Sequence, residues 1–208
     1  MKLILASHSP RRAELLRQMG LVFQIMASGI EESNAVSPYA DWVRHIACLK
    51  AEAVAEIVTG TPEQAEQDQS VRQEGEGPII LAADTIVVKD GQLLGKPADE
   101  NEAAQMLRFL SGGVHEVMTG LCVLNLQTKQ VWQDVERTSV YFRSLTEREI
   151  SAYIASGEPL DKAGAYGIQG LGGLLVERIE GCYYNVVGLP LVKTMDYLRL
   201  CGVKILGG

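Results

Sequence analysis

The sequence contains few cysteines and histidines, which limits the metal sites and cross-links that it can form. Its 208 residues include 4 cysteines and 3 histidines. The cysteines stand singly, with no Cys-x-x-Cys pair, so the pattern excludes both a cysteine-based zinc site and a disulfide framework. We expect the cysteines to be small buried hydrophobic residues.

The chain also lacks a long hydrophobic run and an excess of positive charge. No apolar stretch approaches the roughly 20 residues that span a membrane, and residues 1–6 are too short for the core of a signal peptide. The 19 Lys and Arg residues are outnumbered by 26 Asp and Glu residues, and the net charge of -7 repels a nucleic-acid backbone. The sequence therefore predicts a cytoplasmic protein with no membrane partner and no nucleic-acid partner.

The composition that is present is typical of a globular domain. Hydrophobic residues make up 47% of the chain and charged residues 22%, and a chain of 208 residues can bury a core without disulfides or a structural metal. We therefore expect a single domain over residues 1–208. A segment rich in Gln, Glu and Gly at residues 61–78 has no apolar periodicity and is expected to form a mobile surface loop.

Hydrophobic periodicity and capping residues divide the chain into strands and helices. Strands are expected at residues 3–6, 21–27, 79–88, 116–126, 130–142, 174–179 and 183–187. Helices are expected to begin at Ser9-Pro10, Ser37-Pro38, Asp99, Thr146 and Pro190. Because strands and helices alternate early in the chain and hairpins follow later, we predict an α/β or α+β fold around one mixed sheet.

The first helix begins with two arginines, which its own dipole disfavours. The positive end of a helix dipole penalises each nearby cation by about a few tenths of a kcal/mol and favours anions. Ser7 and Ser9 precede Arg11 and Arg12, so backbone N–H groups, hydroxyls and guanidinium groups could together hold a phosphate. The alternative is that both arginines extend into solvent. His8 lies in the same loop and is expected to serve only the loop structure.

Asp84 is out of place in the strand at residues 79–88, which is otherwise suited to burial. An unpaired carboxylate in a dry interior costs several kcal/mol, so Asp84 must meet a cation or open onto a cleft. Buried acids of this kind are common in metal-dependent phosphate chemistry, and Glu31 and Glu32 could share a divalent cation with it. The alternatives are that Asp84 caps a neighbouring loop and that the two glutamates are solvated.

Two lysines also lie where an anion would explain their positions. Lys50 falls on the apolar stripe of the helix that begins near Pro38, where it needs a buried anion unless it reaches to the helix edge. Lys96 lies on stiff backbone before a proline and is either a phosphate contact or a plain turn residue. The six glycines within residues 157–173 are suited to backbone that lies close against a ligand.

Four motifs along the chain stand out together. They are Ala-Ser-His-Ser-Pro-Arg-Arg at residues 6–12, Ala-Asp-Thr at 83–85, Gly-Lys-Pro at 95–97 and Glu-Pro-Leu-Asp-Lys-Ala-Gly-Ala-Tyr-Gly-Ile-Gln-Gly at 158–170. In combination they resemble the Maf family of nucleotide pyrophosphatases over nearly the whole chain. The last motif is very specific and the first is strong, whereas Gly-Lys-Pro alone is weak. His8 and the long insertion at 61–78 depart from the family pattern.

This resemblance implies an elongated two-lobed fold with a central cleft, similar to inosine-triphosphate pyrophosphatases. It implies hydrolysis of a nucleoside triphosphate between the α- and β-phosphates, with Mg²⁺ or Mn²⁺ as the divalent cofactor. Asp84 matches the family's proton acceptor and would also hold the metal, and Glu32 matches an acid that helps to bind the metal. The positions that match phosphate-associated residues are Ser7, Arg11, Lys50 and Lys96.

Within the family, the sequence resembles the branch of dTTP/UTP pyrophosphatases. Arg12, Thr85 and Gln169 match the positions that mark this branch, as against the branch that acts on 7-methyl-GTP. Gln169 offers one acceptor and two donors, which suits the polar edge of uracil or thymine. The alternatives are a 7-methyl-GTP pyrophosphatase, a non-enzymatic regulator of septum formation and cell division, and a phosphate-binding module without turnover. A homodimer is also considered.

Overall fold

The fold is that of a computed structural model, which describes residues 2–30, 35–60 and 77–207. Residues 61–76 of the predicted loop, and Glu31 and Glu32, lie outside the described residues. The elements are, in chain order, β1 (Leu3–Leu5), α1 (Pro10–Gln18), β2 (Gln24–Ile25), α2 (Tyr39–Thr59), β3 (Ile79–Lys89), β4 (Gln92–Leu94), α4 (Glu100–Leu110), β5 (Val114–Asn125), β6 (Val131–Phe142), α5 (Glu147–Ala155), the 3₁₀ turns η1 (Glu158–Asp161), η2 (Ala163–Ala165) and η3 (Gly170–Leu175), β7 (Val176–Glu180), α6 (Tyr183–Val187) and α7 (Leu191–Leu200).

Within the described residues, the strands form one 7-stranded sheet in the order β2-β1-β3-β5-β6-β7, with β4 also paired to β3. β1 runs parallel to both β2 and β3, and Leu5 lies opposite Leu81. β4 pairs antiparallel with β3, and β7 pairs antiparallel with β6. The predicted α/β fold around a mixed sheet is therefore confirmed, whereas the two-lobed outline with a central cleft stays a prediction. Among the described residues, no helix is long and apolar enough to cross a membrane.

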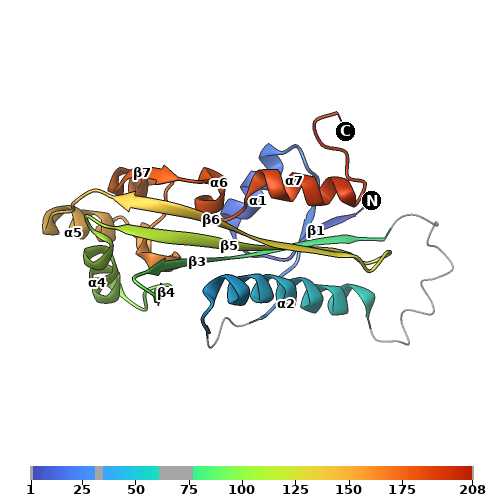
Figure 1. The fold of residues 1–208 in the computed structure, drawn as a ribbon, viewed down its shortest axis with the longest axis horizontal. Coiled ribbons are helices and arrows are strands. Elements are labelled where there is room, and N and C mark those ends of the chain that lie inside the picture. The colour runs from blue at the N-terminus through green and yellow to red at the C-terminus, as the bar shows by residue number, and fades with distance from the viewer. Residues whose placement is uncertain (1, 31–34, 61–76, 208) are drawn as a thin grey trace. The chain divides into compact units, whose positions relative to one another are not determined.

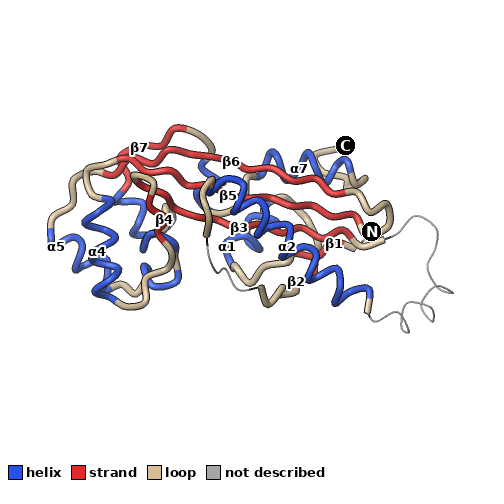
Figure 2. Tube along the Cα trace, turned by 60° about the horizontal axis from the view of Figure 1, so that its bottom comes forward, coloured by secondary structure: helices blue, strands red, loops and turns tan. Residues whose placement is uncertain are grey.

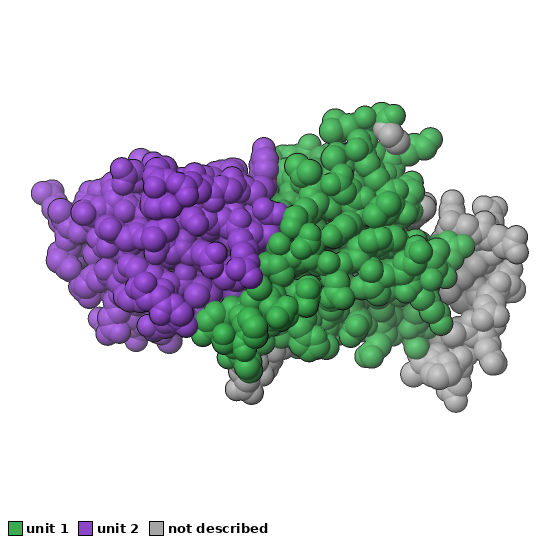
Figure 3. All heavy atoms as spheres, in the orientation of Figure 1, with its two compact units in different colours: residues 1–84, 120–135, 189–208 green, residues 85–119, 136–188 purple. Residues whose placement is uncertain are grey.

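The chain divides into two compact units, which Figure 3 shows in different colours. The first unit contains Met1–Asp84, Gly120–Val135 and Leu189–Gly208, and the second contains Thr85–Thr119 and Glu136–Gly188. The chain passes from one unit to the other inside strands β3, β5 and β6, and again between α6 and α7. That the whole chain is a single domain stays a prediction.

In the first unit, α2 lies on one face of the strands and α7 on the opposite face (Figure 1). Ala47 and Ala51 of α2 pack in one buried cluster with Ile4 of β1 and Ile80 of β3. In β5, a Cβ at position 120 would lie 2.3 Å from the carbonyl oxygen of Val43, so glycine is required there. Small residues therefore let α2 approach the sheet closely, which brings its buried face against the strands.

The second unit has its own core, formed by α4, α5 and the strands. Figures 1 and 2 show α4 and α5 beside each other, and Leu107 and Ile150 from these helices share a buried cluster with Val140 of β6. Both helices begin as the sequence predicts. Asp99 accepts a hydrogen bond from the Glu102 N–H at 2.8 Å at the start of α4, and α5 begins with a complete capping box.

The strand predicted at residues 183–187 is wrong, because the structure forms helix α6 there. Asn185 in this helix is fully buried. Its Nδ2 donates hydrogen bonds to the Val117 carbonyl at 3.0 Å and to the Thr138 hydroxyl at 2.9 Å. These contacts join segments far apart in the sequence, and they outweigh the local preference of valine for strands.

Two other predicted strands are shorter than expected. The strand expected at 174–179 begins only at Val176, because Gly170–Leu175 form the 3₁₀ turn η3. The strand expected at 21–27 is reduced to Gln24–Ile25, which pairs with β1 at one edge of the sheet. The cysteines follow the prediction in part, since Cys182 is half-buried while the other three are buried.

His115 is a buried histidine in the core of the second unit, and its protonation should make the stability of the fold depend on pH. Its Nε2 lies 2.7 Å from the Tyr166 hydroxyl. Burial, assisted by the charge of Lys89, lowers the pKa of His115 to about 4. In the unfolded chain the pKa is about 6.5, so between these values the unfolded state binds a proton that the folded state does not.

We therefore expect the free energy of unfolding to fall by about 3 kcal/mol through this group as the pH drops from about 6.5 to about 4. Denaturant unfolding across this range measures the loss. His115→Gln keeps a hydrogen-bonding partner for Tyr166 but does not titrate, so its pH dependence should be flatter. An equal slope for the two proteins would show that His115 does not carry the effect.

Candidate active site

The loop after β1 places an arginine against a serine at the start of α1. Ser9 caps the helix by accepting a hydrogen bond from the Arg12 N–H at 3.5 Å, with Pro10 in the first turn. The Ser7 hydroxyl accepts hydrogen bonds from the Ser9 N–H at 3.2 Å and from Arg12 Nη1 at 3.0 Å. Arg12 is 9% exposed, so the alternative that both arginines extend into solvent is wrong for Arg12.

This arrangement is suited to an anion. The Arg12 guanidinium brings a positive charge to the start of α1, and its hydrogen bond to Ser7 holds it there. The first turn of α1 contains no acidic residue that would complement its positive end. Arg11 is half-buried in the same turn, and His8 is exposed in the loop.

Asp84 of β3 and Lys50 of α2 form a buried ion pair. Lys50 Nζ donates to Asp84 Oδ1 at 2.6 Å, and the side chains are 10% and 3% exposed respectively. Asp84 therefore meets a cation, as a charge in an apolar strand requires. Lys50 reaches a buried anion from the apolar stripe of its helix, so the alternative in which it reaches to the helix edge is wrong. The same unit contains the Ser7–Arg12 contact.

Thr85, the next residue of β3, belongs to a chain of hydroxyl groups in the second unit. Its Oγ1 lies 3.0 Å from Thr119 Oγ1, and Thr119 Oγ1 donates to the Asn185 carbonyl at 3.0 Å. Since a hydroxyl has one proton, the Thr119 proton is used on Asn185 and Thr85 must donate to Thr119. The Thr85 side chain is thereby held at Thr119.

Lys96 and Gln169 are both exposed in the second unit. Lys96 follows β4, and the carbonyl of its neighbour Gly95 accepts a hydrogen bond from the Gly164 N–H at 3.0 Å, which ties this loop to the glycine-rich segment. Gln169 directly precedes η3. In the part of the chain that the structure describes, no hydrogen bond joins Lys96 to Gln169.

Glycines of the segment 157–173 allow close packing within it and against β3. A Cβ at position 164, where φ is +68°, would lie 3.1 Å from a methyl group of Val87. A Cβ at position 172 would lie 2.1 Å from the Gly167 carbonyl oxygen. At position 172 a side chain would collide with the backbone, and at position 164 the positive φ and the tight contact with Val87 disfavour one, so glycine lets the segment pack closely on itself and against β3.

Asp84 is the one predicted metal ligand among the described residues, and its carboxylate is of a kind that suits a divalent cation. In residues 2–30, 35–60 and 77–207, no three acidic, histidine or cysteine side chains gather as a metal site. Mg²⁺ often takes only one or two carboxylates, and water and phosphate oxygens complete its coordination. Asp84 supplies one hard carboxylate, while Glu32, the other predicted ligand, lies outside the described residues.

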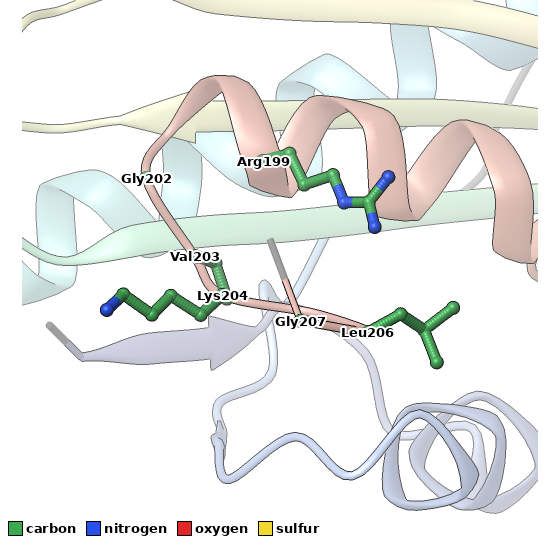
Figure 4. A pocket seen from close by; sticks show the side chains of 6 residues that line it. All are labelled: Arg199, Gly202, Val203, Lys204, Leu206 and Gly207. Atoms are coloured by element: carbon green, nitrogen blue, oxygen red, sulfur yellow. The ribbon is translucent and has the colours of Figure 1, made fainter.

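A shallow depression with a volume of about 570 Å³ lies beside the C-terminal segment and is not the predicted site. Its lining residues, which Figure 4 labels, are Arg199, Gly202, Val203, Lys204, Leu206 and Gly207. The side chains of Arg199 and Lys204 extend in opposite directions in Figure 4, and Arg199 donates to the Ile205 carbonyl at 2.8 Å. The two positively charged side chains therefore do not point toward one bound ligand.

Four residues that contact the predicted site residues or their neighbours were not singled out from the sequence. Thr119 contacts Thr85 directly, and Asn185 contacts Thr119. Tyr153 and Glu158 contact the backbone around Gln169. Asn185 carried a weak signal, as one amide in a run of aromatic and β-branched residues. Glu158 carried a stronger one, because it opens the motif at 158–170.

Comparisons with known proteins give a match over the whole length. A family model described as "Maf-like protein" matches residues 2–201. A curated dTTP/UTP pyrophosphatase of Acetivibrio thermocellus is 47% identical over 207 residues, which cover 99% of this chain and 98% of the relative. The dTTP/UTP pyrophosphatase of Moorella thermoacetica is 48% identical with the same coverage, and that of Pelotomaculum thermopropionicum is 43% identical over 99% of each chain.

Proposed function

Because the chain belongs to the Maf family, we propose that it is a nucleoside triphosphate pyrophosphatase that hydrolyses dTTP and UTP to the monophosphate and pyrophosphate. Relatives with this name are similar to it from end to end. The structural observation that carries the proposal is the buried Lys50–Asp84 pair, which lies in the same unit as the phosphate-suited start of α1.

In the proposed reaction, the residues around α1 bind the phosphates. Ser7, Arg11 and Arg12 supply a hydroxyl and two guanidinium groups beside the positive end of a helix. Lys50 and Lys96 add two further cations. In the proposal these cations offset the repulsion between the negatively charged triphosphate and a chain with a net charge of -7. Such fixed charges stabilise the oxygens of a phosphoryl group in the transition state.

Asp84 accepts the proton of the attacking water. A carboxylate has two oxygens and several acceptor positions, so an ion pair with Lys50 is compatible with a further hydrogen bond to water. The water oxygen forms a new bond to phosphorus as the bridging bond between the α- and β-phosphates breaks. A Mg²⁺ or Mn²⁺ ion, held by Asp84 and Glu32, would neutralise phosphate charge when bound.

Thr85 and Gln169 read the base in this proposal. The Thr85 hydroxyl is held by its contact with Thr119, and in the proposal it accepts a hydrogen bond from the base. Uracil and thymine carry one such donor, N3–H, between two carbonyl groups, and the Gln169 amide can donate to a carbonyl. Purines present a different polar edge.

The proposal is tested by incubating the purified protein with UTP, dTTP and 7-methyl-GTP in the presence of Mg²⁺ or Mn²⁺ and identifying the products. Release of UMP and pyrophosphate is expected, with poor hydrolysis of 7-methyl-GTP. Release of inorganic phosphate would contradict the bond assignment, and a preference for 7-methyl-GTP would contradict the branch. Binding of UTP without turnover would indicate a phosphate-binding module instead. A cytoplasmic location is proposed from the sequence, and a homodimer is kept as a further proposal.

Gln169→Glu is expected to lower kcat/KM for UTP and dTTP by about 10-fold to 100-fold, because a carboxylate replaces the two amide donors. Steady-state kinetics on several triphosphates measure the change, which should be smaller for poor substrates. Gln105→Glu makes the same substitution on the exposed surface of α4 and serves as the control. An unchanged substrate ranking for Gln169→Glu would mean that this residue does not read the base.

A further inference from the structure

Gln169 stands at the N-terminus of η3 without capping it. It occupies the N-cap position, with φ at -88° and ψ at 161°, and its side chain makes no hydrogen bond to the first turn. The unsatisfied N–H groups at a helix start need acceptors, and the N-cap side chain is the usual one. Since the Gln169 side chain does not cap the helix, these groups need another acceptor, from water or from a different side chain.

Glu158 supplies these acceptors from the start of η1. Its Oε1 accepts a hydrogen bond from the Leu171 N–H at 3.1 Å, and its Oε2 accepts one from the Gly172 N–H at 3.3 Å. One carboxylate thus holds two successive N–H groups immediately after Gln169 and Gly170. Hydrogen bonds in which the acceptor is charged are stronger than neutral ones.

The carboxylate lies directly against the backbone that follows Gln169. Gly170 has φ at +65°, and a Cβ there would lie 2.7 Å from Glu158 Oε1. A side chain at position 170 would therefore both strain the backbone and displace the carboxylate. This contact explains why glycine follows Gln169 in the sequence.

Tyr153 of α5 holds the other side of the same loop. Its hydroxyl accepts a hydrogen bond from the Gly167 N–H at 3.3 Å, and the residue is 4% exposed. Burial raises the pKa of Tyr153 to about 12, and the nearby charge of Glu158 adds to the rise. The backbone is thus anchored on both sides of Gln169, by a buried hydroxyl before it and by a carboxylate after it.

We propose that Glu158 is a positioning residue. By accepting hydrogen bonds from the Leu171 and Gly172 N–H groups, it fixes the backbone next to Gln169 and so orients Gln169 for reading the base. This inference rests on the proposed function, since it assigns Glu158 to the same site. Glu158 itself does not need to touch the substrate. Its effect on specificity should therefore pass through Gln169.

The first test replaces Glu158 with glutamine. Glu158→Gln keeps the size of the side chain but places an amide NH₂ against one of the two backbone N–H groups. We expect kcat/KM for UTP and dTTP to fall about 10-fold, with a smaller change for poor substrates, so that discrimination among bases declines. Glu147→Gln, which removes an exposed carboxylate paired with Arg108 in the same unit, is the matched control and should leave the ranking unchanged.

Combining this substitution with Gln169→Ala separates positioning from general stability. If Glu158 acts through Gln169, Glu158→Gln should cause little further loss in the Gln169→Ala background, because interacting residues are not additive. Independent effects that multiply in the double variant would overturn the proposal. If Glu158→Gln does not fold, Glu158→Asp provides the same comparison with the charge retained.

Amide hydrogen exchange gives a readout that does not depend on activity. Exchange at the amide of Leu171 or Gly172 that loses its acceptor should be at least about 10-fold faster in Glu158→Gln than in the wild type, and exchange at both amides should be unchanged in Glu147→Gln. Unchanged exchange at both amides would overturn the role of Glu158. If the wild-type protein did not hydrolyse UTP or dTTP, the proposed function would fail, whereas the exchange experiment would still decide whether Glu158 holds this loop.

Discussion

Asp84→Asn is expected to lower kcat for UTP by about 10²-fold to 10⁴-fold while the protein stays folded. Asparagine has nearly the same shape, and its side-chain oxygen can still accept the hydrogen bond that Lys50 donates to Asp84 at 2.6 Å. It cannot take the proton of the attacking water, and it binds a divalent cation weakly. The loss should appear in turnover, and the melting temperature should also fall, because the buried Lys50 ammonium keeps a hydrogen-bond acceptor but loses the charge that compensates its own.

Asp134→Asn is the control for this experiment. Asp134 is also paired with a lysine in the first unit, at 2.7 Å from Lys193, but both side chains are substantially exposed. Its replacement should leave turnover close to that of the wild type. If Asp84→Asn retained activity within about threefold of the wild type, Asp84 would not be the general base.

Lys50→Met is expected to destabilise the protein by about 3 to 5 kcal/mol and to abolish most activity. The substitution leaves the Asp84 carboxylate, 3% exposed, without the ammonium group that compensates its charge. Breaking a buried ion pair from one side costs this much because the remaining charge stays desolvated. Denaturant unfolding and thermal melting measure the loss.

A second substitution distinguishes lost charge compensation from lost packing. In the Lys50→Met/Asp84→Asn double variant the buried charge is gone, so the protein should be more stable than Lys50→Met alone. Lys193→Met, which breaks the exposed pair with Asp134, should cost no more than about 1 kcal/mol. Equal destabilisation by Lys50→Met and the double variant would show that packing, rather than charge, dominates at position 50.

Local signals predicted the starts of the helices that carry or support the site. Ser9-Pro10, Asp99 and Thr146 each cap a helix as expected, because capping involves residues within three or four positions of each other. Asp84 was visible as a conflict between one charge and an apolar strand. That conflict indicated that Asp84 has a partner, but it did not identify the partner. The arginines at the start of α1 likewise indicated a bound anion, but they did not identify which anion.

The sequence by itself therefore determined the α/β class, the helix starts, the glycine-rich segment and the family of the chain, because these depend on local pattern or on motifs. Only the tertiary structure decided that Lys50 pairs with Asp84, that residues 183–187 form a helix around Asn185, and that Glu158 holds the backbone after Gln169. Each of these joins residues between 13 and 68 positions apart. Such contacts arise from packing, which local propensity does not encode.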